Sequence, residues 1–329
     1  MFWRSAFILA LIFCAMALLF PSLLWFLSWL VGKICSFRVP YAPFFWTGAG
    51  LSFVICCLMT YGHFVGRFKT VVTHETFRCA DLPKNFNGFK VVHISDFHVD
   101  SFDDRPEELR KMVDLVNAQK ADVILFTGDM TTGSGEGVRR HEATLKSLKA
   151  RLGVVSVLGN HDFFIYDRRR SSDAERCLAA DTLAGYERDV LGWRVLRNHS
   201  LTINRGDEKI TIAGVDNVNG HQGFPTIQKG RLSHALKNAA DFTILLTHDP
   251  SHWKSEVLPR SNVQLTLSGH THAAQMRFFG WSLANIAFDE CDGRYEEDGR
   301  MLYVNAGIGC TAPFRIGCPA EITTITLLQ

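Results

Sequence analysis

The 329-residue sequence lacks a strong excess of charge of either sign. It has 35 Lys and Arg residues against 33 Asp and Glu residues, for a formal net charge of +2. No basic arm or stripe dominates the chain, and such a stripe is the usual footprint of a nucleic-acid binder. We therefore expect no nucleic-acid partner, and any anionic substrate must be recognised by a local group of side chains.

The sequence also lacks cysteines at the spacing of a disulfide framework or a CxxC motif. Four of its nine cysteines lie in the hydrophobic N-terminal fifth, and the other five are scattered. This usage is typical of a reducing compartment. The chain shows no internal repeat and no low-complexity segment, and the roughly 260 residues after the hydrophobic part suffice for one large domain with a buried core.

Charged residues are absent from the first of two long apolar runs, which extends from Ala6 to Val31. At about 1.5 Å rise per residue, this run exceeds a hydrocarbon core of roughly 30 Å. A second run, rich in Phe, Trp and Leu, extends from about Tyr41 to Tyr61. The two runs predict that residues 1–68 form a membrane-anchoring helical hairpin.

Two alternatives to the hairpin remain open at this stage. A cleaved signal peptide is one, although the first run is longer than a usual apolar signal region and lacks an obvious small-residue cleavage site. The other is one spanning helix followed by an interfacial segment, because Pro43, Gly48 and Gly50 weaken the second run as a regular helix. Positive charge is slightly greater outside the hairpin turn, which favours a cytoplasmic main domain.

From residue 69 to residue 329 the pattern changes to short apolar segments separated by amphipathic ones. Near-continuous apolar runs indicate strands covered on both faces. Pro106–Gln119 and Arg139–Leu152 each place apolar residues on one helical face. The economical architecture is a layered α/β sandwich. The predicted strands are Lys90–Ile94, Val123–Phe126, Val154–Leu158, Ile210–Ala213, Thr243–Leu246, Gln264–Leu267, Leu302–Asn305 and Ile322–Leu327.

Most of these strands are followed by polar clusters. Loops at the carboxyl ends of strands in α/β sheets converge on one crevice, so we expect the clusters to lie together. Glycines precede several of the polar groups, which is consistent with tight turns that bring the backbone close to the site. The clusters are Asp96-Phe97-His98, Gly128-Asp129, Gly159-Asn160-His161-Asp162, Thr247-His248-Asp249 and Gly269-His270-Thr271-His272.

The clusters predict metal coordination. A lone Asp or His after a strand is more often a turn residue or a helix cap, but five such clusters in succession share the chemistry of metal ligands. Carboxylate, imidazole and amide oxygen without thiolate suit Mn, Fe, Zn or Mg rather than a Cys-type structural zinc. One ion cannot easily use so many groups, whereas two ions sharing a carboxylate can, and such a pair is a usual device for displacement at phosphorus.

In order and spacing, the blocks D-x-H, G-D, G-N-H-D, H and G-H-x-H resemble those of the calcineurin-like metallophosphoesterases, from about Phe89 to the C-terminus. The resemblance implies a metallophosphoesterase β-sandwich flanked by helices, with two divalent ions, Mn²⁺ foremost and Fe or Zn as alternatives. It further implies a first metal on Asp96, His98 and His272, a second on Asn160, His248 and His270, a bridging Asp129, a catalytic His161 that faces the phosphoryl group, and Asp162 orienting His161.

Segments such as Ile212–Asp216 and Asn305–Ile322 resemble the branch of the family that has N-terminal membrane segments. Within it, the chain is similar to the UDP-2,3-diacylglucosamine pyrophosphohydrolases of lipid A biosynthesis, which yield lipid X and UMP. This implies an acylated nucleotide-sugar substrate, the lipid bilayer as a partner, and a bacterial-type inner (cytoplasmic) membrane with the catalytic domain on the cytoplasmic side. Ala273-Ala274 departs from the Gly-Gly or Ala-Gly common after the final histidine.

The segment from Phe163 to Asn198 is a possible substrate lid. Its aromatic residues suit acyl chains, and Arg168, Arg169 and Arg170 suit a diphosphate or anionic headgroups. An amphipathic surface helix with a solvated basic run explains the same residues equally well. Two rival functions stay open: a phosphodiesterase or phosphatase for another lipid or soluble ester, and a catalytically inactive membrane scaffold.

Several other polar residues are not assigned to the site. We expect His93 to be a core histidine with a hydrogen-bond partner. Asn217 and Asn219, in the loop after Asp216, have two readings, as residues that line the substrate cleft or as turn residues, and we expect the turn. The sequence leaves the oligomeric state open.

Overall fold

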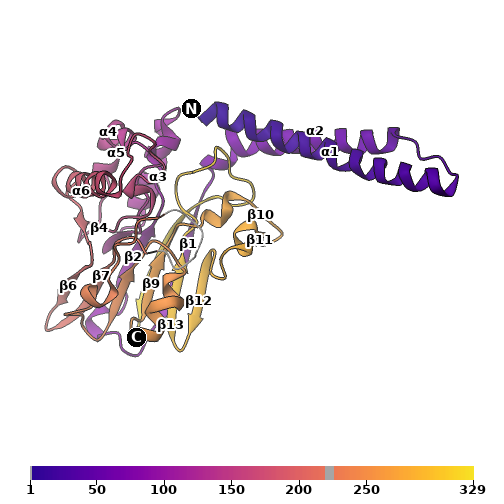
Figure 1. The fold of residues 1–329 in the computed structure, drawn as a ribbon. Coiled ribbons are helices and arrows are strands. Elements are labelled where there is room, and N and C mark those ends of the chain that lie inside the picture. Colours follow the sequence, from indigo (N-terminus) through magenta and orange to yellow (C-terminus); the bar gives the residue numbers. More distant parts are fainter. Residues whose placement is uncertain (1, 219–225) are drawn as a thin grey trace. The chain divides into compact units, whose positions relative to one another are not determined.

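The computed structural model describes residues 2–218 and 226–329, and the chain divides into two compact units (Figure 1). The first contains the chain up to Phe68 together with Ala312–Gly317. The second contains Lys69–Thr311 and Cys318–Gln329. The sequence had placed residues 312–317 with the catalytic domain, so their grouping with the N-terminal helices is a feature of the tertiary structure alone. Asn219 lies outside the described residues.

The first unit is a helical hairpin of α1 (Phe2–Cys35) and α2 (Ala42–Phe64), followed by the short helix η1 (Gly66–Phe68). Both α-helices are long and apolar enough to cross a membrane. Ser52 Oγ donates a hydrogen bond to the carbonyl of Cys14, at 3.1 Å, and so links the two helices. The predicted helical hairpin therefore fits the structure, with each helix extending a few residues beyond the predicted apolar run.

The segment Ala312–Gly317 packs on the C-terminal end of α2. Nδ1 of the buried His63 lies 2.7 Å from the carbonyl oxygen of Pro313, and the Arg315 N–H donates to the carbonyl of Gly62 at 3.2 Å. A Cβ added at Gly66 would overlap the carbonyl oxygen of Arg315. The close approach of the two backbones thus requires glycine at this position.

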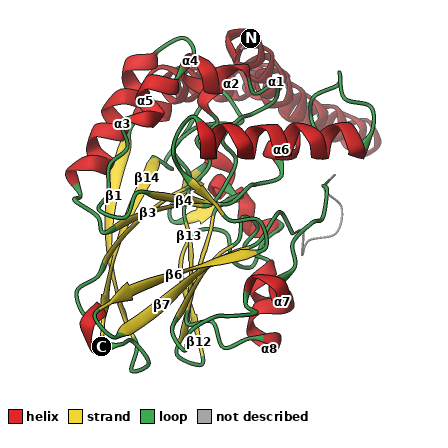
Figure 2. Cartoon of the chain, turned by 90° about the vertical axis from the view of Figure 1, so that its left-hand side faces the viewer, coloured by secondary structure: helices red, strands yellow, loops and turns green. Residues whose placement is uncertain are grey.

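The second unit is built on two six-stranded mixed sheets (Figure 2). Their facing sides form one core, in which Val91 and Leu125 of one sheet are fully buried with Ile244 and Leu267 of the other. The first sheet has the order β1 (Thr70–Arg78), β14 (Ala320–Leu328), β2 (Lys90–Ile94), β3 (Val123–Phe126), β4 (Val154–Ser156), β5 (Arg194–Val195). The second has the order β12 (Gly293–Glu297), β13 (Arg300–Val304), β9 (Leu265–Ser268), β8 (Thr243–Leu246), β7 (Glu208–Gly214), β6 (His199–Arg205).

Helices flank both sheets, as the sequence predicted. On β8 the side chain of Leu245, which points away from the central core, packs with Trp253 and Leu232 in a second apolar cluster. In α3 the predicted apolar face is buried. The helices are α3 (Pro106–Ala118), α4 (Glu136–Arg140), α5 (Glu142–Lys146), α6 (Asp173–Asp189), α7 (Leu232–Ala235) and α8 (Leu258–Arg260), with the short helices η2 (Lys84–Phe86), η3 (Val99–Phe102), η4 (His161–Phe163), η5 (Trp253–Val257), η6 (His272–Gln275) and η7 (Leu283–Ile286).

The central strands match the sequence prediction, whereas the edges do not. β2, β3 and β8 have the predicted bounds, but β1, β5, β6 and β12 were not predicted. These unpredicted strands lie at sheet edges and are largely exposed, so their sequences carry polar residues and no continuous apolar run. The single helix predicted for Arg139–Leu152 is instead the pair α4 and α5, which meet at His141.

Candidate metal centre

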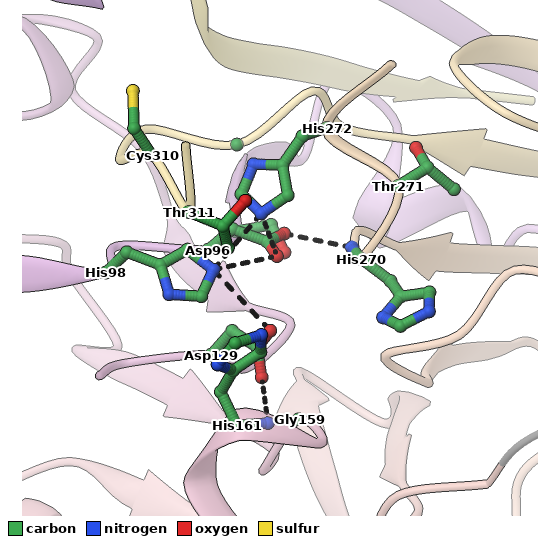
Figure 3. Close-up of polar contacts among 12 residues, drawn as sticks. Asp96, His98, Asp129, Gly159, His161, His270, Thr271, His272, Cys310 and Thr311 are labelled. Atoms are coloured by element: carbon green, nitrogen blue, oxygen red, sulfur yellow. Dashed lines mark hydrogen bonds and ion pairs between the residues drawn. The ribbon is translucent and has the colours of Figure 1, made fainter. Parts of the chain in front are cut away.

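The polar clusters meet where strands of both sheets end. β2, β3 and β4 are parallel neighbours in the first sheet, and β8 and β9 are parallel neighbours in the second. Within each sheet the carboxyl ends therefore lie at the same edge, and the loops that follow them bring the predicted ligands together. Figure 3 shows five of these ligands, Asp96, His98, Asp129, His270 and His272.

The first group consists of Asp96, His98 and His272, all buried. Nε2 of His98 lies 3.1 Å from Nε2 of His272, and Nε2 of His272 lies 3.2 Å from Oδ1 of Asp96. This Asp96 oxygen is buried and accepts no hydrogen bond from the described residues. Three lone-pair atoms thus converge on one point, which is the arrangement that a cation satisfies.

The second group consists of His248 and His270 next to Asp129, with the Asn160 side chain against both rings. Oδ1 of Asn160 lies 3.1 Å from Nε2 of His248 and 3.0 Å from Nδ1 of His270. The two ring nitrogens lie 3.2 Å apart. Nδ1 of His248 is 2.7 Å from the Thr127 carbonyl oxygen, an acceptor, so Nδ1 carries the proton and Nε2 is directed at the group.

Asp129 lies between the two groups. Its Oδ2 is 3.2 Å from Nε2 of His248 and 3.6 Å from Nε2 of His98. Burial by itself would raise the pKa of the Asp129 carboxyl, but the charges of His248 and His161 outweigh it and hold the pKa well below its ordinary value. A carboxylate that stays ionised and contacts both groups is placed where a bridging ligand would lie.

The donor set fits two divalent cations. Ionised carboxylates, imidazoles and an amide oxygen are all metal ligands, and no thiolate takes part. Although burial opposes the charge on His248, Asp129 beside it raises the pKa of this histidine to about 10. A histidine must be neutral to coordinate a metal, so ion binding at this group would displace a proton. The same ligands suit Mn, Fe and Zn alike.

The local backbone is strained where the ligands project. Asp96, His98, Asp129, His270 and His272 all have φ between 38° and 74°. Such left-handed backbone is uncommon for residues other than glycine, and it clusters at functional sites because the surrounding structure must hold it. The strain allows the short loops after three strands, β2, β3 and β9, to aim these side chains at one centre.

Two glycines leave space for the ligands. A Cβ at Gly159 would overlap Oδ1 of Asp129 and lie 2.7 Å from the His248 ring. A Cβ at Gly269 would overlap Ser95 Oγ and Oδ2 of Asp96. The sequence predicted this close approach of backbone to the site at both positions.

His161 lies beside the ligands, but not in the environment that the resemblance implied. Its N–H donates to Oδ1 of Asp129 at 2.9 Å, and its Nδ1 lies 2.9 Å from the carbonyl oxygen of Thr132. The Thr132 carbonyl, not Asp162, therefore orients the imidazole. Nδ1 carries the proton of this hydrogen bond, so Nε2 is the ring atom left to exchange a proton.

Asp162 instead fastens two loops together. Its carboxylate accepts hydrogen bonds from the N–H groups of Asp129 at 2.7 Å, Met130 at 2.8 Å and Gly159 at 2.9 Å. The expectation that Asp162 orients His161 is wrong, because the carboxylate accepts from backbone N–H groups of its own loop and of the loop after β3. Its effect on the site is to fix the loops that carry Asp129 and Asn160.

The predicted lid residues divide in the structure. Phe163 and Phe164 are buried, and Phe163 packs with α6, so neither is available to an acyl chain. Among the arginines, Arg169 and Arg170 form ion pairs with Asp167 at 3.0 Å and 3.2 Å.

The third predicted arginine, Arg168, is exposed and forms no ion pair with the described residues.

Tyr166 contributes to the site in a way that the sequence did not predict. Its half-exposed ring lies 4.5 Å from that of His161, between centroids, and its only signal in the sequence was proximity to the G-N-H-D block.

The sequence comparisons agree with this geometry. The model of the calcineurin-like phosphoesterase family matches residues 89–274. The chain is 31% identical over 279 residues to the uncharacterised metallophosphoesterase YkuE of Bacillus subtilis, covering 81% of this chain and 88% of that protein. It is 30% identical over 256 residues to a transmembrane protein with metallophosphoesterase domain from Danio rerio. That alignment covers 75% of this chain but only 55% of the relative.

Two solved structures are similar to the chain at low identity. The phosphopantetheinyl hydrolase of Mycobacterium tuberculosis aligns with a TM-score of 0.41 and 14% identity, over 70% of this chain and 97% of that one. A dimetal phosphatase from Danio rerio aligns with a TM-score of 0.40 and 13% identity, over 73% and 99%. The family match spans more than half of the chain and includes every predicted metal ligand, from Asp96 to His272. The chain therefore belongs to the calcineurin-like phosphoesterases, a family of metal-dependent phosphoester hydrolases.

Proposed function

We propose that this protein is a membrane-anchored hydrolase that cleaves a phosphate ester or anhydride at a centre of two divalent cations. The observation that carries the proposal is the position of the Asp129 carboxylate, in contact with His98 on one side and His248 on the other. When bound, the two cations would neutralise phosphoryl oxygens and lower the pKa of the attacking water.

The side chains of the site have separate tasks in this proposal. Asp96, His98 and His272 would hold one ion, Asn160, His248 and His270 the other, and Asp129 both. Nε2 of His161 would form a hydrogen bond to the phosphoryl group and give a proton to the leaving oxygen. Phosphoryl transfer depends mainly on alignment and charge neutralisation, so no covalent enzyme intermediate is required.

For the substrate, we propose the diphosphate of UDP-2,3-diacylglucosamine, cleaved to lipid X and UMP. The support is the resemblance of the whole chain to the membrane-associated branch and the presence of two helices able to cross a membrane. The relative from Danio rerio is likewise named a transmembrane protein. We place the catalytic domain on the cytoplasmic side of a bacterial-type inner membrane, on the bias of positive charge toward that side.

Metal titration tests the chemistry. Purified protein stripped of metal is expected to hydrolyse bis(4-nitrophenyl) phosphate only after Mn²⁺, Fe²⁺ or Zn²⁺ is added, and Asp129→Ala is expected to stay inactive with every ion. Restoration by Mn²⁺ at the lowest concentration would support manganese. If no ion restores turnover on any phosphate compound, the chain is an inactive scaffold and the proposal fails.

A substrate comparison tests the lipid. UDP-2,3-diacylglucosamine, non-acylated UDP-sugars and other lipid phosphates would be compared by kcat/KM, with mass spectrometry to identify the bond that breaks. A preference of at least about tenfold for the diacylated compound is expected. Equal values with the non-acylated sugar would argue for a phosphodiesterase or phosphatase with a soluble substrate.

A further inference from the structure

A strongly apolar stretch follows directly after the last metal ligands. From Met276 to Phe288 the only charged residue is Arg277, and this residue forms an ion pair with Asp292. We call this stretch the aromatic hairpin. Its large apolar side chains are exposed to a degree unusual for a folded domain: Phe278 41%, Phe279 109%, Trp281 51%, Leu283 47% and Ile286 77%.

The exposure of these side chains is built into the local structure. Among the described residues, strands β10 (Arg277–Phe278) and β11 (Trp281–Ser282) pair with each other and with neither of the two large sheets. Phe279 and Gly280 between them have φ of 52° and 84°, the signs required by a tight hairpin turn. The turn therefore presents Phe279 at its tip rather than folding it back onto the domain.

The base of the aromatic hairpin is fastened to the domain. Ser282 Oγ donates a hydrogen bond to the carbonyl of Ala273, next to His272, and the Ser282 N–H donates to Asn285 Oδ1 at 2.9 Å. At its other end, the Phe288 ring packs edge-on against the ring of His270, with 5.6 Å between centroids. The exposed apolar tip is thus connected at both ends to residues of the metal centre.

A lipid surface is the occupant that this composition fits. Exposed apolar clusters mark interaction sites, and Trp and Phe with few charges are typical of the headgroup boundary of a bilayer. The chain itself contains two helices able to cross a membrane, so a bilayer is always within reach of the domain at high effective concentration.

We propose that the aromatic hairpin inserts into the boundary between headgroups and acyl chains, and that this contact presents the metal centre to phosphate groups carried by lipids. The insertion stands independently of the reaction, whereas the presentation of lipid phosphate rests on the proposed function. Because the aromatic hairpin is fastened beside His272 through Ser282 and packs against His270 through Phe288, the depth of its insertion would set the depth of the metal centre.

Trp281 provides a direct test of the insertion. The full chain and Trp281→Phe would be reconstituted in phosphatidylcholine and phosphatidylglycerol vesicles, and the difference of their fluorescence isolates Trp281 from the six other tryptophans. Quenching of this difference by brominated lipid, and protection from aqueous acrylamide, is expected. Quenching by acrylamide alone overturns insertion, and protection from both quenchers overturns it in favour of a second copy of the chain.

Kinetics test the presentation of lipid phosphate. Phe279→Ser with Ile286→Ser is expected to raise KM for a bilayer-embedded lipid phosphoester about tenfold and to leave turnover of bis(4-nitrophenyl) phosphate within about twofold. Leu178→Ser, on the 67%-exposed Leu178 of α6, is the matched control and should change neither. An unchanged KM in the double variant overturns the presentation.

The two tests separate the possible failures. If Trp281 is quenched by lipid but no metal supports hydrolysis of any phosphate compound, the proposed function fails while insertion holds. If hydrolysis is metal-dependent but Trp281 stays accessible to acrylamide, the proposed function holds and the aromatic hairpin has no role at the membrane.

Discussion

Thr132 determines what His161 can do. Its carbonyl oxygen lies 2.9 Å from Nδ1 of His161, which fixes that nitrogen as the donor and leaves Nε2 for the substrate. Burial is the main cause that lowers the pKa of His161, and the charge of Asp129 opposes it. His161 is thus aimed by Thr132 and is not among the proposed metal ligands, although its ring lies within 4.8 Å of ligand atoms of His98 and Asp129.

We predict that His161→Ala lowers kcat by about 10²–10⁴, the usual range for loss of a general acid. Metal content is expected to stay at the wild-type level, because the variant retains every proposed ligand. The loss is expected to be smaller for 4-nitrophenyl esters than for alkyl esters, since a better leaving group needs less protonation. An equal loss for both esters would contradict the proton-transfer role.

Glu187 is a buried carboxylic acid near Asp162. Its Oε2 accepts a hydrogen bond from Ser156 Oγ at 2.6 Å, and its Oε1 has no hydrogen-bond partner among the described residues. Burial, aided by the charge of Asp162, raises the pKa of Glu187 from 4.5 to about 8. Between pH 4.5 and about pH 8, the Glu187 carboxyl therefore keeps its proton in the folded chain and loses it in the unfolded chain.

We therefore predict that the stabilising contribution of Glu187 is complete below about pH 4.5 and is lost as the pH rises through about 8, with a slope of at most about 1.4 kcal/mol per pH unit. Glu187→Gln, which cannot ionise, is expected to show a smaller fall in Tm between pH 6 and pH 8 in detergent. Asp114→Asn, at an exposed position of α3, is the control. Identical pH profiles of wild type and Glu187→Gln would contradict the prediction.

At the scale of elements, the ends of the central strands decide the site. β2 and β9 belong to different sheets, yet Gly269 after β9 lies against Ser95 and Asp96 after β2. The His270 N–H also donates to Oδ2 of Asp96 at 3.0 Å. The two sheets are thus joined at the metal centre by contacts that leave no space for a side chain at position 269.

We predict that Gly269→Ala displaces Asp96 and lowers both metal content and kcat/KM at least about tenfold, because the added methyl group must move Ser95 or the carboxylate. Gly133→Ala is the matched control, since a Cβ at Gly133 meets nothing within 4 Å. Metal content by elemental analysis and activity at saturating metal would be measured for both. Full occupancy in Gly269→Ala would show that the turn can adapt.

At the scale of the whole molecule, one segment of the C-terminal region folds with the N-terminal helices. Phe314, Arg315 and Ile316 are all buried, and the backbone of Arg315 contacts Gly62 and Gly66 near the end of α2. The anchor is therefore more than a tether at one end of the chain, because it provides the packing surface for residues 312–317.

We predict that removal of residues 1–68 lowers Tm and leads to aggregation without detergent, because residues 312–317 lose the contacts made by His63 and Gly62. Removal of residues 1–40 retains α2 and should be less harmful in detergent. Size-exclusion chromatography and thermal unfolding would compare the two. A monodisperse protein with the Tm of the full chain after removal of residues 1–68 would contradict this prediction.

The sequence alone determined the two apolar helices, the central strands and the residues that gather at the strand ends. These follow from local rules: long apolar runs, buried strands with continuous apolar residues, and polar groups confined to the loops that follow them. It did not reveal the edge strands β1, β5, β6 and β12, which are short or largely exposed and carry no continuous apolar run.

Only the tertiary structure decided what the neighbours of the site do. It directed the Asp162 carboxylate to the backbone N–H of Asp129, gave the orientation of His161 to the Thr132 carbonyl, buried Phe163, and left Phe279 exposed. Each outcome depends on which backbone groups lie opposite a side chain after the sheets have packed. Residue type and spacing specify the ligands of a metal centre, but the partners that orient them come from distant segments and are fixed by packing alone.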